Sequence, residues 1–299
     1  MPTTRPPAPV LTMMPSSRGF LGLPAPHPRP RAVIVPFGLE ASVSYGRGTA
    51  KAPAAILRAS HQVELYDEEF GCEAHARYGV ETLRPPRVAA RMEAALNQIE
   101  ALVRPFLVAR QFPLILGGEH TLTAGAIRPF AERYPDLAVL HIDAHADLRD
   151  SYDGQKFSHA TTMRRVVEVG NFRVFSFGIR NIAAEEIAYS EQHRNRISLF
   201  WARERKVWNL KRALAPLKNR PIYVSFDVDG LDAALMPATG TPEPGGLDWD
   251  EALAIVRTAA GLGRLVGADI TELAPQPHGH AYDFLAAKLA YKILNYAFL

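Results

Sequence analysis

Cysteine is almost missing from this chain of 299 residues, with Cys72 as the one example. A single cysteine cannot form a disulfide within the chain, which excludes the disulfide framework that small secreted domains need. No second cysteine or partner motif accompanies Cys72, so we interpret it as an unreactive thiol. Nothing in the cysteine usage points to an oxidising compartment, and we expect the protein to be cytoplasmic.

Long apolar runs and blocks of like charge are missing too. No apolar run approaches the roughly 20 residues that a membrane helix requires. The 34 Lys and Arg residues are scattered among 31 Asp and Glu residues, without the basic run or helix face that follows a phosphate backbone. We therefore expect neither a membrane nor a nucleic acid as a partner.

Acidic residues are absent from the first 30 positions, which are rich in proline. That composition superficially suggests a transit peptide, but the prolines would prevent the amphipathic helix that such a peptide needs. We interpret residues 1–18 as an extended, proline-rich N-terminal arm for which disorder is one expectation. Residues 19–299 are then expected to form a single domain.

Short apolar runs recur along that domain and lack the polar alternation of a half-exposed sheet. Such runs suit parallel strands that are covered on both faces. Helical patterns separate several of them, at residues 88–111, 122–134 and 248–262. This succession predicts an α/β fold with a parallel sheet, and no internal repeat marks a second domain. The runs are RAVIVPFG, PLILGG, LAVLHIDA, FRVFSFGI, PIYVSFDVD and RLVGADI.

Titratable side chains follow four of these runs in the same relative position. In an open parallel sheet, ligands bind beyond the carboxyl ends of the strands, where loops converge. Alternate residues of an extended segment point to the same side, so the spacing in DAHAD and DVD predicts that each set faces one point. The residues are Glu119 and His120; Asp143, His145 and Asp147; Asp227, Asp229 and Asp232; and Glu272.

The carboxylates at these strand ends need a counter-charge that the motifs do not contain. Four aspartates left unpaired in a low-dielectric setting would each cost several kcal/mol. Arg149 is the one cation nearby, and it lies at the margin of the motifs. Two divalent cations would balance the four charges. We therefore predict a two-metal site whose ligands are His120, Asp143, His145, Asp147, Asp227 and Asp229.

The donor types favour manganese at that site. Oxygen donors with one imidazole for each ion suit Mn²⁺ better than Zn²⁺, and Ni²⁺ and Co²⁺ remain alternatives. Two such ions held close together activate water near neutral pH. A lone DxD or DxH would more often form a turn, so the prediction depends on four strand ends together. We expect supporting or turn roles for Glu119 and Asp232, and His141 lies within its strand, out of step with the ligand side.

Five longer segments carry a resemblance to a known family. In order, they are GGEHTLT, HIDAHADLRD, FSHATTMRR, VSFDVDGLDAALMPATGTPEPGGL and GADITELAP. From about residue 20 to the C-terminus, the chain resembles the ureohydrolase family of arginases and agmatinases, and within it the agmatinase branch. The resemblance implies a three-layer α/β/α domain with an eight-stranded, mostly parallel sheet. It also implies a binuclear manganese centre and hydrolysis of a guanidino group to urea and an amine.

The resemblance implies roles for individual residues as well. The family's metal ligands fall on the same six residues that charge balance selects. Its mobile proton-transfer histidine matches His159 and its guanidinium-binding glutamate matches Glu272, while Asp147 would orient the attacking water. The implied substrate is a small cationic guanidino compound, agmatine first, which would give putrescine and urea. The implied assembly is a homotrimer or homohexamer.

Departures from the family pattern concern the substrate tail. Arginases have an asparagine where this chain has Arg149, and a serine and asparagine pattern where it has DSYDGQKF, so recognition of arginine is doubtful. Arg149 would also disfavour the distal ammonium of agmatine unless Asp150 or Asp153 neutralises it. Ala233 stands where relatives usually have proline, which should affect the shape of the loop more than the chemistry.

Three alternatives stay open. Related hydrolases of guanidinobutyrate, guanidinopropionate, guanidine or formiminoglutamate would use the same site chemistry. A deacetylase-like enzyme of related fold with one zinc ion would need fewer ligands, so His120 and Asp147 argue against it. A regulatory or scaffold protein without activity would be expected to have shed some of the eight site residues, and none is missing.

Overall fold

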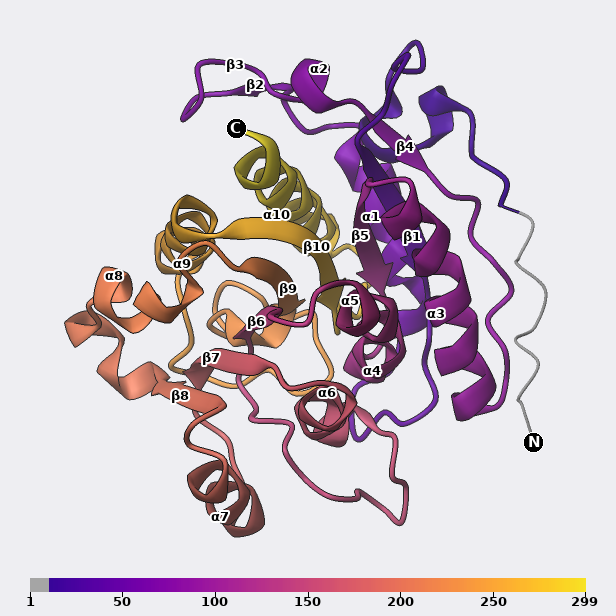
Figure 1. The fold of residues 1–299 in the computed structure, drawn as a ribbon. Coiled ribbons are helices and arrows are strands. Elements are labelled where there is room, and N and C mark those ends of the chain that lie inside the picture. Colours follow the sequence, from indigo (N-terminus) through magenta and orange to yellow (C-terminus); the bar gives the residue numbers. More distant parts are fainter. Residues whose placement is uncertain (1–10) are drawn as a thin grey trace.

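Eight parallel strands form the central sheet of the protein, whose computed structural model describes residues 11–299 (Figure 1). Their order across the sheet is β4-β1-β5-β10-β9-β6-β7-β8, and β2 pairs with β3 in a separate antiparallel ribbon. The α/β fold predicted from the apolar runs and the eight-stranded α/β/α architecture implied by the resemblance are both confirmed. The bounds are β1 Ala32–Phe37, β2 Tyr66–Asp67, β3 Cys72–Glu73, β4 Val80–Thr82, β5 Phe112–Gly117, β6 Ala138–Ile142, β7 Arg173–Ile179, β8 Ile197–Trp201, β9 Pro221–Asp227 and β10 Arg264–Thr271.

Helices cover both faces of the sheet, as the uninterrupted apolar strands require. Alternate residues of β1 enter two different cores, with Ile34 in one and Val33 and Val35 in the other. On the first face lie α1 (Ala52–Ser60), α9 (Trp249–Leu262) and α10 (His280–Phe298), and on the second α3 (Met92–Val108), α4 (Thr123–Ala126), α5 (Arg128–Arg133) and α6 (Thr162–Val169) (Figure 1). The remaining helices are α2 (His75–Tyr78), α7 (Ala184–Gln192) and α8 (Leu210–Ala213).

The helical pattern predicted at residues 122–134 is broken in the structure. Two short helices, α4 and α5, replace one long helix, and Pro129 stands at the start of the second. Proline cannot donate a backbone hydrogen bond and is tolerated in the first turn of a helix. The pattern at residues 248–262 is a helix, and Asp248 caps it by accepting a hydrogen bond from the Glu251 amide at 2.7 Å.

The predicted N-terminal arm falls partly outside the described residues, which begin at position 11. Within residues 11–18, Met13 makes an antiparallel bridge with Leu83, and Ser16–Arg18 forms a single 3₁₀ turn. Phe20, just beyond the arm, is buried in the core. None of the helices in residues 11–299 has the length and apolar character needed to cross a membrane.

The strands that precede the predicted ligands are neighbours in the sheet. Strands β5, β10, β9 and β6 lie side by side, and their register brings their carboxyl ends to one edge. Thr271 of β10 lies beside Asp227 of β9, and Phe226 lies beside Ile142 of β6. The loops that follow these strands therefore start from adjacent points at the same edge.

Candidate metal centre and active site

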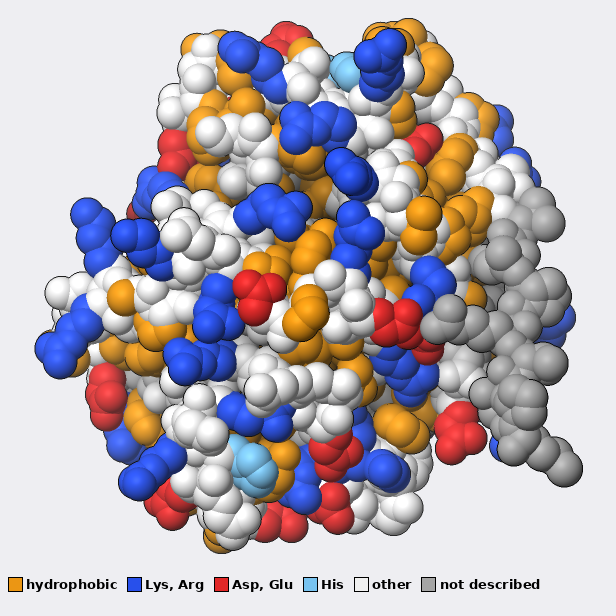
Figure 2. Space-filling model, viewed as in Figure 1, with side chains coloured by type: hydrophobic (Ala, Val, Ile, Leu, Met, Phe, Trp, Pro, Cys, Tyr) orange, Lys and Arg blue, Asp and Glu red, His pale blue; other side chains and the backbone are white. Residues whose placement is uncertain are grey.

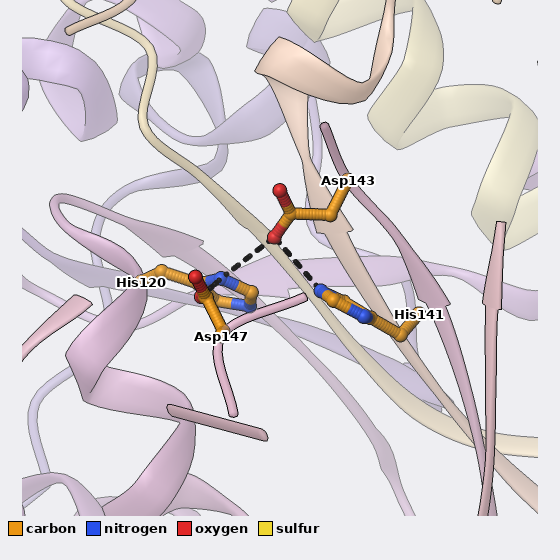
Figure 3. A group of neighbouring side chains, drawn as sticks. All are labelled: His120, His141, Asp143 and Asp147. Atoms are coloured by element: carbon orange, nitrogen blue, oxygen red, sulfur yellow. Dashed lines mark hydrogen bonds and ion pairs between the residues drawn. The ribbon is translucent and has the colours of Figure 1, made fainter. Parts of the chain in front are cut away.

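Three of these loops bring predicted ligands into contact around one imidazole. His120 follows β5, and its Nδ1 atom lies 3.2 Å from Asp143 Oδ2, 2.9 Å from Asp147 Oδ2 and 3.5 Å from Asp227 Oδ2. Figure 3 shows His120 and Asp147 close together, with Asp143 above them. These residues come from the loops after β5, β6 and β9, so the contact depends on the order of strands in the sheet.

A second group forms around His145. Its Nδ1 atom lies 3.0 Å from Asp229 Oδ2 and 3.5 Å from Asp143 Oδ1. Asp143 thus belongs to two groups of candidate ligand atoms, one that includes His120 and Asp147 and one that includes His145 and Asp229. A carboxylate shared by two adjacent groups is the arrangement that holds two metal ions side by side.

The backbone reaches this arrangement by turns, which corrects the expectation of extended segments. Strand β6 ends at Ile142, and Asp147 has a φ of 53°, a left-handed conformation that is uncommon outside glycine. Asp227 accepts a hydrogen bond from the Asp229 amide at 2.9 Å, which closes a 3₁₀ turn over Val228–Gly230. The period-two rule holds only inside strands, whereas Asp227 is the last residue of β9 and the ligands after it and after β6 lie past the strand ends.

Glycine at position 230 allows that turn to approach the loop after β6. A Cβ atom on Gly230 would lie 2.7 Å from the backbone nitrogen of Asp143, closer than non-bonded atoms allow. The Ala144 amide donates to Asp229 Oδ1 at 3.0 Å across the same gap. A side chain at position 230 would push the two ligand-bearing loops apart.

The donor set fits a pair of hard divalent cations. His120 Nδ1 is buried and makes no hydrogen bond, although three carboxylate oxygens lie within 3.5 Å of it. An imidazole nitrogen aimed between carboxylates without donating to one has the geometry of a metal ligand. Four carboxylates and two imidazoles provide the oxygen-rich donors that Mn²⁺ favours.

The pKa shifts in this cluster show that its buried carboxylates ionise readily only where a positive charge lies beside them. Burial opposes ionisation of Asp143, but the imidazoles of His141 and His120 outweigh it and hold the pKa of Asp143 well below its usual range. Burial and the neighbouring carboxylates of Asp229 and Asp143 raise the pKa of Asp227 well above its usual range. Burial also opposes charge on His145, yet Asp229 and Asp143 raise its pKa to about 12. Protons thus balance the carboxylates wherever no other cation does.

Two buried residues, His141 and Ser225, support the ligands, a role that the sequence did not predict for either of them. His141 Nε2 lies 2.8 Å from Asp143 Oδ2 (Figure 3). Its Nδ1 lies 2.9 Å from Ser176 Oγ, so both ring nitrogens are engaged. Ser225 Oγ lies 2.9 Å from His120 Nε2 and donates to Asp269 Oδ1 at 2.8 Å. Partners of this kind fix the orientation of metal-binding side chains. The available signal was a set of polar residues inside otherwise apolar strands.

His159 lies at the wall of the same site, at the start of a 3₁₀ turn before α6. Its Nε2 atom is 2.7 Å from Ser44 Oγ, its Nδ1 atom is 3.2 Å from Ser42 Oγ, and Tyr152 packs edge-on against its ring. Ser42 and Ser44 belong to the loop after β1, and no sequence pattern pairs them with His159. Hydroxyl groups on both ring nitrogens allow the imidazole to exchange a proton on either side.

Glu272 follows β10 and faces the cluster. Its Oε1 atom accepts a hydrogen bond from the His120 amide at 2.6 Å, and its φ is 64°, a strained conformation for a glutamate. Burial and the nearby Glu119 raise the pKa of Glu272 well above its usual range. Glu119 itself accepts hydrogen bonds from Ser42 and Thr121, a supporting position consistent with the expectation for it.

These residues line a cavity of about 340 Å³. Its lining includes every predicted site residue except Asp143, which is buried. The loop that contains Gly240, Thr241 and Glu243 forms one wall. Arg180 ties that wall to the ligand turn, because its guanidinium donates to Glu243 O at 2.8 Å and to Asp229 O at 2.7 Å.

Arg149 lies at the mouth of the cavity, and its partners differ from those predicted. Its guanidinium lies 3.5 Å from Glu185 Oε1 and 4.0 Å from Glu186 Oε2, both near the start of α7. Asp150 instead pairs with Arg164 and Arg165 on α6. Adjacency in sequence suggested Asp150 or Asp153 as the neutralising group, but packing of α7 against this loop supplies other carboxylates. Asp232 takes the predicted turn role, accepting from the Gly245 and Gly246 amides.

Comparisons with known proteins agree with this geometry. A sequence profile of the arginase family matches residues 30–295. An N(1)-aminopropylagmatine ureohydrolase from Synechocystis is 36% identical over 275 residues, which cover 88% of each chain. An agmatinase from Bacillus cereus is 36% identical, covering 88% of this chain and 91% of its own.

Solved structures give the same result. The agmatine ureohydrolase of Thermoplasma volcanium superposes with a TM-score of 0.81 at 29% identity and covers 90% of both chains. The resemblance predicted from the sequence motifs is confirmed. The chain belongs to the arginase family and is a hydrolase of carbon–nitrogen bonds.

Proposed function

We propose that this protein hydrolyses agmatine to putrescine and urea, with two manganese ions held by the six candidate ligands. The observation that carries the proposal is the pair of ligand groups that share Asp143 at the base of a cavity. Relatives that are 36% identical are named for agmatine and for N(1)-aminopropylagmatine. Both compounds carry a guanidino group on a cationic tail.

Each residue type suits one task in such a reaction. His120, Asp143, Asp147 and Asp227 would hold one ion, and Asp143, His145, Asp227 and Asp229 the other. When bound, the pair of ions lowers the pKa of a coordinated water and supplies a nucleophile near neutral pH. The protein's part is to fix the geometry of these ligands and to orient the substrate.

The substrate's guanidinium group needs a carboxylate partner close to the ligands. A guanidinium remains protonated near neutral pH and presents a planar fork of N–H donors. Glu272 has the matching carboxylate, and its other oxygen is already fixed by the His120 amide. Charge-assisted hydrogen bonds to Glu272 would hold the guanidinium carbon beside Asp147, which would orient the attacking water.

Departure of the amine requires a proton. Cleavage of the carbon–nitrogen bond leaves an electron pair on the departing nitrogen, and that nitrogen is a poor leaving group until it is protonated. An imidazole can give and regain a proton near neutral pH. His159 lines the cavity and contacts Ser44. Ser44 donates to Tyr152 Oη at 3.3 Å in an exposed position, so these hydroxyl groups connect the imidazole with solvent.

The mouth of the cavity suits a positively charged tail. Arg149 is paired there with Glu185 and Glu186, and Glu243 lies on the facing wall. Tyr45 also lines the mouth and is 84% exposed. The longer N(1)-aminopropylagmatine is a second candidate substrate, because one of the 36% identical relatives is named for it.

The experiment is urea release by protein reconstituted with Mn²⁺, Ni²⁺ or Zn²⁺, measured over agmatine, N(1)-aminopropylagmatine, guanidinobutyrate and arginine. We expect the highest kcat/KM for agmatine with Mn²⁺. His159→Ala should lower kcat by about 10²- to 10⁴-fold with unchanged metal content. His193→Ala is the matched control, because His193 directly follows α7 and does not line the cavity. Absence of urea from every compound would refute the proposal, and an unchanged His159→Ala would remove that residue from the mechanism.

We also propose a cytoplasmic homotrimer or homohexamer. The support is the family resemblance together with a single free cysteine, Cys72, which suits a reducing compartment. Light scattering coupled to size-exclusion chromatography would give the mass of the assembly. A monomer of 32.9 kDa would contradict the proposal.

A further inference from the structure

A second cavity lies at the opposite edge of the sheet from the candidate metal centre. Its volume is about 350 Å³, and it opens where β1, β5 and β10 begin, between the ends of α5 and α10. Figure 1 looks onto this edge, and the same view of the surface shows several blue side chains around exposed apolar atoms near the middle of the face (Figure 2). Four of the lining residues are Arg31, Arg110, Arg133 and Arg264.

These four arginines have no counter-charge of their own. No carboxylate lines the cavity, and none of the four forms an ion pair with another residue in positions 11–299. Elsewhere the protein pairs its arginines readily, as with Arg104 and Glu132 or Arg257 and Glu69. Four like charges gathered around one hollow repel each other unless an anion lies between them.

Aromatic contacts hold three of the guanidinium groups without neutralising them. Arg31 lies over the ring of Phe298 at 4.7 Å, and Arg133 and Arg264 lie over the ring of Tyr134 at 5.6 and 5.5 Å. Stacking on an aromatic face restricts a guanidinium group while its N–H edges stay available for anions. The three side chains are exposed, and these ring contacts restrict them in part, which lowers the entropy that a ligand must overcome.

The fourth arginine occupies an unfavourable backbone position. Arg110 has a φ of 60° just after α3, a left-handed conformation that glycine or asparagine usually adopts at the end of a helix. A residue other than glycine is strained in that conformation. Arginine at this position adds a fourth positive charge to the cavity wall at a cost in backbone energy.

The floor of the cavity is apolar. Phe112, Leu265 and Val266 form it, beside the ring of Phe298. The volume lies in the range of small-molecule sites, roughly 300–1,000 Å³. A ligand that fits must therefore combine several negative charges, which the arginine forks can bind bidentately, with a part that tolerates an apolar floor. The positive charges surround a hollow rather than forming a stripe, which argues against a polynucleotide.

We propose that this cavity is a second binding site, for a small organic polyphosphate of the size of a nucleoside diphosphate. Phosphate oxygens would accept from the four guanidinium groups, and the organic part would lie against the apolar floor. The site is distinct from the candidate active site, because the two cavities share no lining residue and lie at opposite edges of the sheet. Binding at the two sites should therefore be independent.

Isothermal titration of the metal-loaded protein with ADP, pyrophosphate and adenosine at low salt tests this proposal. We expect ADP to bind most tightly, pyrophosphate less tightly, and adenosine much more weakly than either. Arg133→Glu combined with Arg264→Glu should weaken ADP binding by at least about tenfold. The matched control is Arg77→Glu with Arg212→Glu, an equal change of charge at exposed arginines outside the cavity, which should leave the affinity unchanged.

Arg110→Gly removes one positive charge from the cavity without a risk to folding, since glycine suits the backbone at that position. It should retain stability and weaken ADP binding a few-fold. No binding of ADP at millimolar concentration, equal loss in the control variant, or equal affinity for adenosine would overturn the proposal. Competition between ADP and agmatine in the urea-release assay would also overturn it, because that result would place ADP in the other cavity. Tighter binding of an oligonucleotide than of ADP would identify the face as a nucleic-acid surface instead.

Discussion

Two buried groups of charged side chains in this protein balance their charges in different ways. Between α10 and the β2–β3 ribbon, Lys292 Nζ lies 2.8 Å from Asp67 Oδ1 and 3.4 Å from Glu69 Oε2. Asn295 donates to the other oxygen of Asp67 at 2.6 Å, and Tyr296 donates to Glu69 at 2.7 Å. Lys292 and Asp67 are almost fully buried, and every charge there has a partner from the chain.

The cluster at the carboxyl edge of the sheet has no such partner. Within residues 11–299, no Lys or Arg forms an ion pair with any of its four aspartates, and only imidazoles lie within ion-pair distance of their carboxylate oxygens. Both clusters meet the same desolvation cost. A structural cluster carries its own cation, whereas a cluster that lacks one is prepared for an ion from outside.

The largest effect should come from removing one ligand of the proposed metal pair. Asp229→Asn keeps the shape of the side chain but removes its charge, and we expect loss of one ion per chain. Turnover should fall by more than about 10⁴-fold, beyond the effect of one proton-transfer residue, because generation of the nucleophile depends on both ions. Elemental analysis and urea release measure the two outcomes.

Asp232→Asn is the matched control, since Asp232 lies in the following turn and accepts only from backbone amides. It should keep two ions and most of the activity. An Asp229→Asn variant that is fully loaded and active would show that the aspartates at this edge need no external cation.

The next effect concerns the self-compensated cluster. Lys292→Met leaves the buried Asp67 without its cation, so unfolding in denaturant should show a loss of about 3–5 kcal/mol. Metal content should not change, because this cluster lies between α10 and the β2–β3 ribbon and includes none of the candidate ligands. The double variant Asp67→Leu with Lys292→Met removes both charges and should recover most of the loss. If the double variant were as unstable as the single one, the cost would come from packing and not from an unpaired charge.

A smaller effect should follow from changing the support behind a ligand. Ser225 connects His120 to Asp269, so Ser225→Ala should lower metal affinity by about 10- to 100-fold while leaving the ligands in place. Competition with a chelator measures the affinity. Ser190→Ala removes a buried hydroxyl that bonds only to a helix carbonyl and serves as the control. If the two variants bound metal with equal affinity, Ser225 would make no contribution to metal binding.

The apolar runs of the sequence predicted six of the eight strands, without β4 and β8, and the residues that follow them gave the set of charged side chains at the carboxyl edge of the sheet. Apolar runs such as residues 138–142 favour strands buried on both faces, and the charge of the aspartates that follow requires a counter-ion wherever they meet. Those inferences depend on local composition and on a general rule for parallel sheets. They hold without knowledge of which helix packs where.

The contacts of individual side chains could not be predicted in the same way. Ser42 and His159 are 117 positions apart, and Arg149 lies beside Glu185 because of how α7 packs. Sequence proximity suggested Asp150 for Arg149 and missed both serines. The turn at Asp147 also departs from the strand period, because the left-handed backbone there is stabilised by tertiary contacts rather than by local preference.

The smallest effect is a difference in how the two clusters respond to pH. Lys292 and Asn295 outweigh the burial of Asp67 and lower its pKa, so the stability that Asp67 contributes is present above its ordinary pKa and is lost only in stronger acid. Burial and nearby carboxylates raise the pKa values of Asp227 and Glu272, so the metal-free protein should lose stability as pH rises from about 4 through those raised values. Each unit of difference between folded and unfolded pKa is worth about 1.4 kcal/mol.

Denaturant unfolding of chelator-treated protein between mildly acidic and neutral pH measures this slope. Asp227→Asn removes one of the raised groups and should flatten the slope, whereas Asp67→Asn should leave it unchanged over that range because Asp67 stays ionised throughout. Added Mn²⁺ should reverse the sign, since the ions bind the deprotonated carboxylates and release protons. Metal-free protein that gains stability over the same range would mean that the chain already compensates its acid cluster, and the contrast between the two regions would not hold.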